Sequence, residues 1–205
     1  DFNEMLYLVT AGPQPDGSPI ALYSYEVGDL TLGLGITDDQ DWSLGAGYSG
    51  DFWSVGLGYE SIQNGAEITL RDGSDWGNIG GSEIISFITP DDAHQTIGQA
   101  SITFSNVTLK GAYGLIDLEN AGDIAQYGIS ASYGMDAITL TGFWRGTEFD
   151  FDNSNINDQT NNFFGLGLAY DLGGGLAIET GVVQADYDFL DSNVVVADFG
   201  LSFNF

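Results

Sequence analysis

The side chains that could carry out chemistry in this chain are mostly carboxylates. The 205 residues include 30 aspartates and glutamates against three lysines and arginines, a single histidine and no cysteine. Nucleophilic hydrolysis needs a base and an orienting group within reach of the nucleophile. The only histidine, His94, follows Pro90-Asp91-Asp92 in a segment that we expect to be a loop. We therefore predict that the protein is not an enzyme.

Oxygen ligands are concentrated where Ca²⁺ could bind. Asp150, Asp152 and Asp158 are spaced along one acidic segment in a way that could hold this ion, although the central Gly and the final Glu of an EF-hand are missing. The alternative is a solvated acidic loop. The sequence requires no cofactor, and Ca²⁺ in the acidic loops is the one that it suggests.

Composition excludes several classes of protein. A net charge of −27 would repel the phosphates of a nucleic acid. The absence of cysteine excludes disulfides and thiolate metal sites. The longest apolar runs are far shorter than the ~20 residues of a membrane-spanning helix. If the chain crosses a membrane, it must therefore cross as β-strands.

The pattern that positions the charged residues is a series of alternating segments of strand length. Thirty glycines and 23 phenylalanines and tyrosines against two methionines favour strands and turns. Short turns such as Gly28-Asp29 alternate along the chain with longer polar loops such as 61–96, as in outer-membrane barrels. We predict eleven strands: 20–27, 30–37, 42–49, 52–60, 97–104, 107–115, 124–133, 137–147, 162–170, 176–185 and 194–205.

The two faces of these strands differ in character. In 194–205, Phe199, Leu201, Phe203 and Phe205 alternate with polar or small residues, which suits a wall with lipid on one side and water on the other. Inward positions of the other strands are mostly Gly, Ser, Thr and Gln. The charged residues within the predicted strands all have inward parity, so we predict that they line a pore: Glu26, Glu60, Lys110, Arg145, Glu179 and Asp198.

The amino-acid sequence of several segments is similar to that of a known family. Residues 161–175 and 196–205, with 19–25 and 54–60, resemble strands of the general porins of Rhodobacter-type alphaproteobacteria. The resemblance implies a homotrimer of sixteen-stranded barrels, each narrowed by an inward-folded loop, with the terminal Phe205 as the assembly signal. Residues 1–18 would then be the end of the constriction loop, and 19–205 barrel strands and loops. The segment 61–96 has no match in the family.

These observations lead to one interpretation of the chain. We expect an all-β, transmembrane antiparallel β-barrel of the bacterial outer membrane, a single domain over 1–205, with about five further strands before residue 1. Counting Glu4 to Thr10 as a twelfth strand is the competing view. The expected function is passive diffusion of ions and small hydrophilic solutes, in contact with outer-membrane lipid and lipopolysaccharide. The alternatives are a blocked structural or adhesion barrel and a secreted calcium-binding β-protein.

Overall fold

The computed structural model describes residues 9–11, 19–37, 41–63, 66–71, 83–89, 92–152, 157–188 and 193–203. All regular elements in these ranges are β-strands. No helix in the described ranges is both long and apolar enough to cross a membrane.

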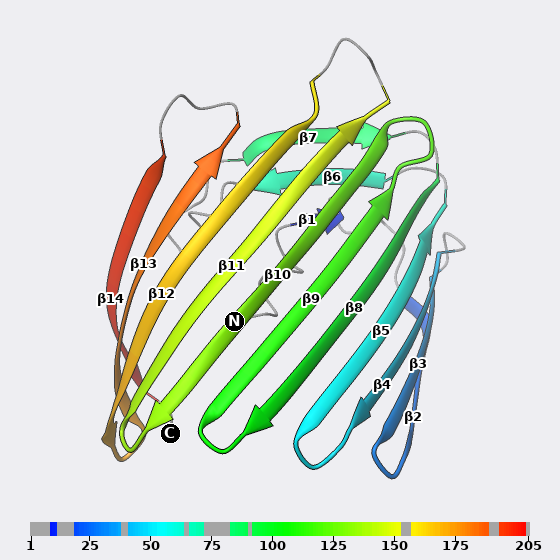
Figure 1. The fold of residues 1–205 in the computed structure, drawn as a ribbon. Coiled ribbons are helices and arrows are strands. Elements are labelled where there is room, and N and C mark those ends of the chain that lie inside the picture. The colour runs from blue at the N-terminus through cyan, green and yellow to red at the C-terminus, as the bar shows by residue number, and fades with distance from the viewer. Residues whose placement is uncertain are drawn as a thin grey trace.

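Eleven strands form one antiparallel sheet in which almost every strand pairs with its neighbours in the chain (Figure 1). The order across the sheet is β14-β13-β12-β11-β10-β9-β8-β5-β4-β3-β2. Their bounds are β2 Pro19–Val27, β3 Leu30–Thr37, β4 Trp42–Ser49, β5 Trp53–Ile62, β8 Ala93–Phe104, β9 Val107–Asp117, β10 Gly122–Met135, β11 Ile138–Phe151, β12 Gln159–Gly173, β13 Leu176–Tyr187 and β14 Val194–Phe203. The eleven strands predicted from the sequence are thereby confirmed, and several extend further at their loop ends.

Turn chemistry fixes the register at one end of the sheet. Gly28 begins the β2–β3 turn with a φ of +58°, which glycine adopts without steric cost. Ser105 and Asp136 take a similar left-handed φ in the β8–β9 and β10–β11 turns. These tight connections lie together at the lower end of the sheet in Figure 1, and the opposite ends of the strands lie at the upper end. We call the two ends the turn end and the loop end.

Cross-strand register gives the sheet two chemically distinct faces. On the outer face, Leu57 of β5 and Leu166 of β12 belong to a broad set of exposed apolar side chains. On the opposite face, which we call the inner face, hydroxyl pairs link neighbouring strands. The hydroxyl oxygens of Ser54 and Ser101 are 2.7 Å apart, and those of Ser132 and Thr141 are 2.9 Å apart. A sheet with an apolar outer face and a polar inner face is the arrangement that a barrel wall in lipid requires.

A second, smaller sheet departs from the sequence-based prediction. β1 (Val9–Ala11) pairs with β6 (Ala66–Arg71), which pairs with β7 (Glu83–Thr89). The prediction that 1–18 and 61–96 are loops is therefore wrong for these strands. They are shorter than the ~9–11 residues of a membrane-spanning strand, so they do not give the sequence pattern of one. Of the competing twelfth strand, Glu4 to Thr10, only Val9 and Thr10 lie within the described residues, and these two pair with β6 and not with β14.

Candidate functional site: the inner wall of the sheet

All six charged residues singled out in the sequence lie on the inner face. Lys110 stands between Ser101 and Ser130 on the neighbouring strands, and Asp198 lies opposite Gly181. The other four occupy equivalent positions, as their cross-strand partners show: Glu26 opposite Thr31, Glu60 between Ser43 and Gln95, Arg145 between Gly128 and Phe163, and Glu179 between Ala169 and Gly200. Small or polar neighbours leave five of these charges room to contact water, whereas Arg145 lies beside the ring of Phe163.

The six charges differ in how far they are exposed. Glu26, Lys110, Glu179 and Asp198 are exposed, and the Glu179 carboxylate accepts a 3.1 Å hydrogen bond from the Ser202 hydroxyl. Glu60 and Arg145 are only partly exposed. The four exposed residues are therefore the ones that could act directly on an ion in the water next to this face.

Arg145 has a structural contact that its charge alone does not suggest. Its guanidinium carbon lies 4.2 Å from the centre of the Phe163 ring, a distance typical of a cation–π interaction. Tyr187 meets the same ring edge-on at 5.5 Å between centroids. Arg145 is thus part of an aromatic group on the inner face, and packing as well as charge holds it there.

The inner face is not uniformly polar, which corrects the expectation drawn from the sequence. Two apolar clusters lie on it at the loop end. The first is centred on Ala93, Ile116, Leu118, Ile124 and Phe149, and the second on Phe163, Ala185 and Tyr187. Alternation alone could not reveal them, because period two assigns a residue to a face but does not say what covers that face. The runs of large apolar residues at inward positions near the loops were the available signal.

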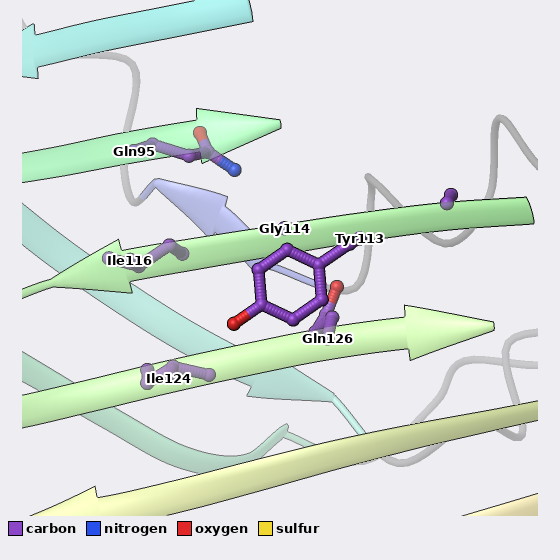
Figure 2. Close-up of a pocket in the computed structure, with 7 residues that line it drawn as sticks. Gln95, Tyr113, Gly114, Ile116, Ile124 and Gln126 are labelled. Atoms are coloured by element: carbon purple, nitrogen blue, oxygen red, sulfur yellow. The ribbon is translucent and has the colours of Figure 1, made fainter. Parts of the chain in front are cut away.

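A shallow hollow lies beside the first cluster (Figure 2). Its floor is Gly114, where the missing side chain leaves a gap between Ile116 and the amides of Gln95 and Gln126. The complete lining is Gln95, Ala112, Tyr113, Gly114, Ile116, Ile124 and Gln126. Amide groups beside apolar side chains make this a neutral part of the inner face.

Among the residues that the structure describes, charge on the outer face of the large sheet lies where the strands extend beyond the apolar zone. Asp117, Asp123 and Asp150 are directly opposite one another on β9, β10 and β11 at the loop end. Burial and the carboxylates of Asp117, Asp150 and Asp152 raise the pKa of Asp123, whose strand has already left the apolar zone at this level. The sequence analysis missed this row because the predicted strands ended before it.

Two residues that lie outside the strands predicted from the sequence belong to strands in the structure. His94 lies in β8 on the outer face, where its Nδ1 is 3.1 Å from the Tyr59 hydroxyl and the two rings stack. Glu148 lies in β11 and accepts a 2.6 Å hydrogen bond from the Tyr127 hydroxyl. His94 therefore packs beside the Tyr59 ring on the outer face, away from the six inner charges.

The predicted calcium ligands are not brought together in the described part of the chain. No group of three or more His, Asp or Glu residues among the described residues is close enough to hold a metal ion. The Asp158 carboxylate instead accepts a 3.1 Å hydrogen bond from the backbone N–H of Phe151, which ties together the two sides of the β11–β12 connection. Calcium binding by Asp150, Asp152 and Asp158 stays a prediction. Phe205, the predicted assembly signal, lies outside the described residues.

Comparisons with known proteins agree with this geometry. The model of the Gram-negative porin family matches residues 5–190. A porin of Rhodobacter capsulatus is 26% identical, over 93% of this chain and 62% of that protein. A porin structure refined at 1.8 Å is similar with a TM-score of 0.63 and 26% identity, over 90% of this chain and 60% of the other. A loop L8 deletion mutant of OmpT, an outer membrane protein of Vibrio cholerae, has the same fold, with a TM-score of 0.61, 15% identity and coverage of 88% and 60%. The chain thus spans about three fifths of the length of these relatives.

Proposed function

This chain belongs to the Gram-negative porin family, and from that premise we propose that it forms the wall and the mouth of a water-filled channel, through which ions and small hydrophilic solutes diffuse passively. The family places the protein in the bacterial outer membrane and indicates a channel rather than an enzyme. The observation that carries the proposal is the separation of the two faces. Exposed apolar side chains occupy the outer face, while the six charges and the hydroxyl pairs occupy the inner one.

The charges on the inner face favour cations. Of the six charged residues predicted from the sequence, four are carboxylates (Glu26, Glu60, Glu179 and Asp198) and two are cations (Lys110 and Arg145), a difference of two negative charges. A low-dielectric wall concentrates such a field in the water beside it and raises the local concentration of cations. We therefore expect a weak preference for cations that fades as salt shortens the screening length.

Reconstitution into planar lipid bilayers tests the channel function. We expect discrete conductance steps whose size rises with salt concentration, since ions would move through water and not by way of a saturable site. A protein that inserts into the bilayer without conductance steps would instead support the blocked structural or adhesion barrel. A protein that never associates with lipid would support the secreted calcium-binding alternative.

We also propose homotrimers and contact with lipopolysaccharide for this protein. The trimer rests on the resemblance to Rhodobacter-type porins, and cross-linking in native outer membranes followed by mass analysis tests it.

The proposed contact with lipopolysaccharide rests on the outer face. The carboxylates of Asp117, Asp123 and Asp150 lie there beyond the apolar zone, where divalent cations could bridge them to lipid phosphates. Removal of divalent cations with EDTA should then lower the amount of lipopolysaccharide that copurifies with the protein.

A further inference from the structure

Burial of the inner face changes along the length of the strands. Toward the turn end, inner-face residues such as Gln99, Lys110 and Asp198 are exposed. Toward the loop end, Ile124 is 2% exposed and Phe163 is 6% exposed, although both also point inward from the same single sheet. A one-layer wall facing water would leave both ends similarly open. A second layer of chain must therefore cover the inner face at the loop end.

Within the described part of the chain, the small sheet β1-β6-β7 is the element in position to contribute to that layer. In Figure 1 it lies behind the loop end of the large sheet, with β6 and β7 running across the barrel strands and not along them. In Figure 2, strands again lie behind β9 and β10, while the ring of Tyr113, an outer-face residue, lies in front. Both views therefore put the small sheet on the inner side.

The points where the chain leaves and re-enters the large sheet tie the small sheet to the first apolar cluster. Ile62, at the end of β5, packs against that cluster, and Ala93, at the start of β8, is 1% exposed within it. These two residues are also cross-strand partners. The backbone N–H of the next residue, Gln63, donates a 2.7 Å hydrogen bond to the Asp41 carboxylate, which fixes the exit from β5. The β6–β7 hairpin is thus held at both of its ends at one place on the wall.

We infer that the β6–β7 hairpin, paired with β1, is an internal barrier across the loop-end mouth of the channel, which narrows the aqueous path and limits the size of solutes that pass. The inference rests on the proposed channel function. Three backbones joined by ladder hydrogen bonds make a barrier that holds its shape better than a single loop. Because the strands run across the wall, they occupy part of the opening that solutes must cross.

Deleting the hairpin tests the inference directly. Since Ile62 and Ala93 are already cross-strand partners, residues 64–91 can be replaced by Asn-Gly, which would close β5 and β8 with a tight hairpin turn. Single-channel conductance in planar bilayers should rise by roughly twofold or more, because conductance through an aqueous pore follows its narrowest section. Liposome swelling should show that larger sugars enter. The matched control replaces residues 153–156 of the β11–β12 connection by Asn-Gly, and its conductance should equal that of the unaltered protein.

The outcomes separate this inference from the proposed function. If the unaltered protein conducts and the hairpin deletion conducts equally, the barrier is overturned and the channel function stands. If neither protein conducts, the channel function itself fails.

A disulfide tests the pairing that makes the barrier, without a deletion that could disturb folding. Thr10 and Thr69 are cross-strand partners in β1 and β6, and the chain has no cysteine of its own. The double variant Thr10→Cys/Thr69→Cys should form an intramolecular disulfide on mild oxidation in the membrane, whereas the offset pair Thr10→Cys/Ser86→Cys should not. Failure of the first pair to cross-link in a folded, conducting protein would overturn the inference.

Discussion

At the scale of single residues, exposure decides which of the inner charges should act on passing ions. Lys110 and Asp198 are exposed on the inner face, whereas Arg145 packs on the Phe163 ring and Glu60 is only partly exposed. Replacing Arg145 would remove a packing contact as well as a charge, so its effect on ions could not be isolated. Lys110 and Asp198 are therefore the residues at which ion selectivity is best tested.

Changing the charge at these two positions should move the selectivity in opposite directions. Asp198→Asn should lower the cation-to-anion permeability ratio and Lys110→Glu should raise it, each by roughly 1.5-fold at low salt, because both alter the field on the inner face. Reversal potentials under a salt gradient measure the ratio. Glu148→Gln is the control, since Glu148 lies on the outer face beside Tyr127. Equal ratios for all three variants would mean that the inner charges do not face an open aqueous path.

The carboxylate row on the outer face should cost stability at neutral pH. Asp123 faces Asp117 and Asp150 directly, and its pKa is raised by burial and by these carboxylates. Because the folded-state pKa exceeds the unfolded one, ionisation of Asp123 disfavours the fold above that pKa, and the penalty disappears as the pH falls through it. Asp123→Asn should therefore raise the melting temperature at pH 7. The free energy of unfolding should rise by less than about 1 kcal/mol, since repulsion between like charges on neighbouring strands costs little more than this.

The same comparison at low pH provides the check on this prediction. Near pH 3 the unaltered protein and the variant should melt together. Asp136→Asn, at an exposed turn on the opposite end of the sheet, should change neither value. A stabilisation by Asp123→Asn that persists at low pH would point to a cause other than charge repulsion.

At the scale of elements, β12 shows how adjacent residues of one strand serve different environments. Phe163 is 6% exposed and packs with Tyr187 on the inner face, whereas its neighbour Phe164 is 50% exposed on the outer face. The alternation of a strand thus separates a structural aromatic residue from one that meets the membrane. Any experiment on aromatic residues in this barrel must choose between the two.

That choice defines the test of the terminal aromatic residue as an assembly signal. Deleting Phe205 should lower the amount of folded protein in the outer membrane several-fold, whereas Phe164→Leu should leave it nearly unchanged, because leucine also fits a lipid-facing position. Heat-modifiable migration on gels measures the folded fraction. Phe163 is unsuitable as the control, since its loss would unpack Arg145. Similar losses from both variants would assign Phe205 a packing role only.

At the scale of the whole molecule, the net charge of −27 coexists with a wide apolar surface because the two occupy different zones. Exposed leucines, valines and aromatic residues cover the outer face of the sheet, while the charged residues described on that face lie at the loop end. A monomeric protein in water rarely exposes so continuous an apolar surface. The outer face is therefore suited to lipid.

This apolar outer surface predicts how the protein behaves when cells are broken and fractionated. It should remain in the membrane fraction through washes with buffer, high salt and EDTA, and it should dissolve only when detergent covers the outer face. Fractionation followed by immunoblotting measures this, with a periplasmic protein as the control for leakage. Release into plain buffer in folded form would contradict a membrane-spanning sheet.

The sequence alone determined the eleven long strands and the face on which the six charges within the predicted strands lie. Both follow from local rules, because alternation has a period of two and the turns are marked by residues such as Gly28 and Asp136. The inner-face positions of Glu26, Lys110 and Asp198 could therefore be predicted without a structure.

Only the tertiary structure decided what covers the inner face. The hairpin of β6 and β7, its pairing with β1, and the burial of Ile124 and Phe163 depend on segments that are distant in the chain. Alternation constrains which way a side chain points, but whether it then meets water or another layer of chain is set by non-local packing. For the same reason, sequence spacing could not show that Asp158 ties the β11–β12 connection or that His94 contacts Tyr59.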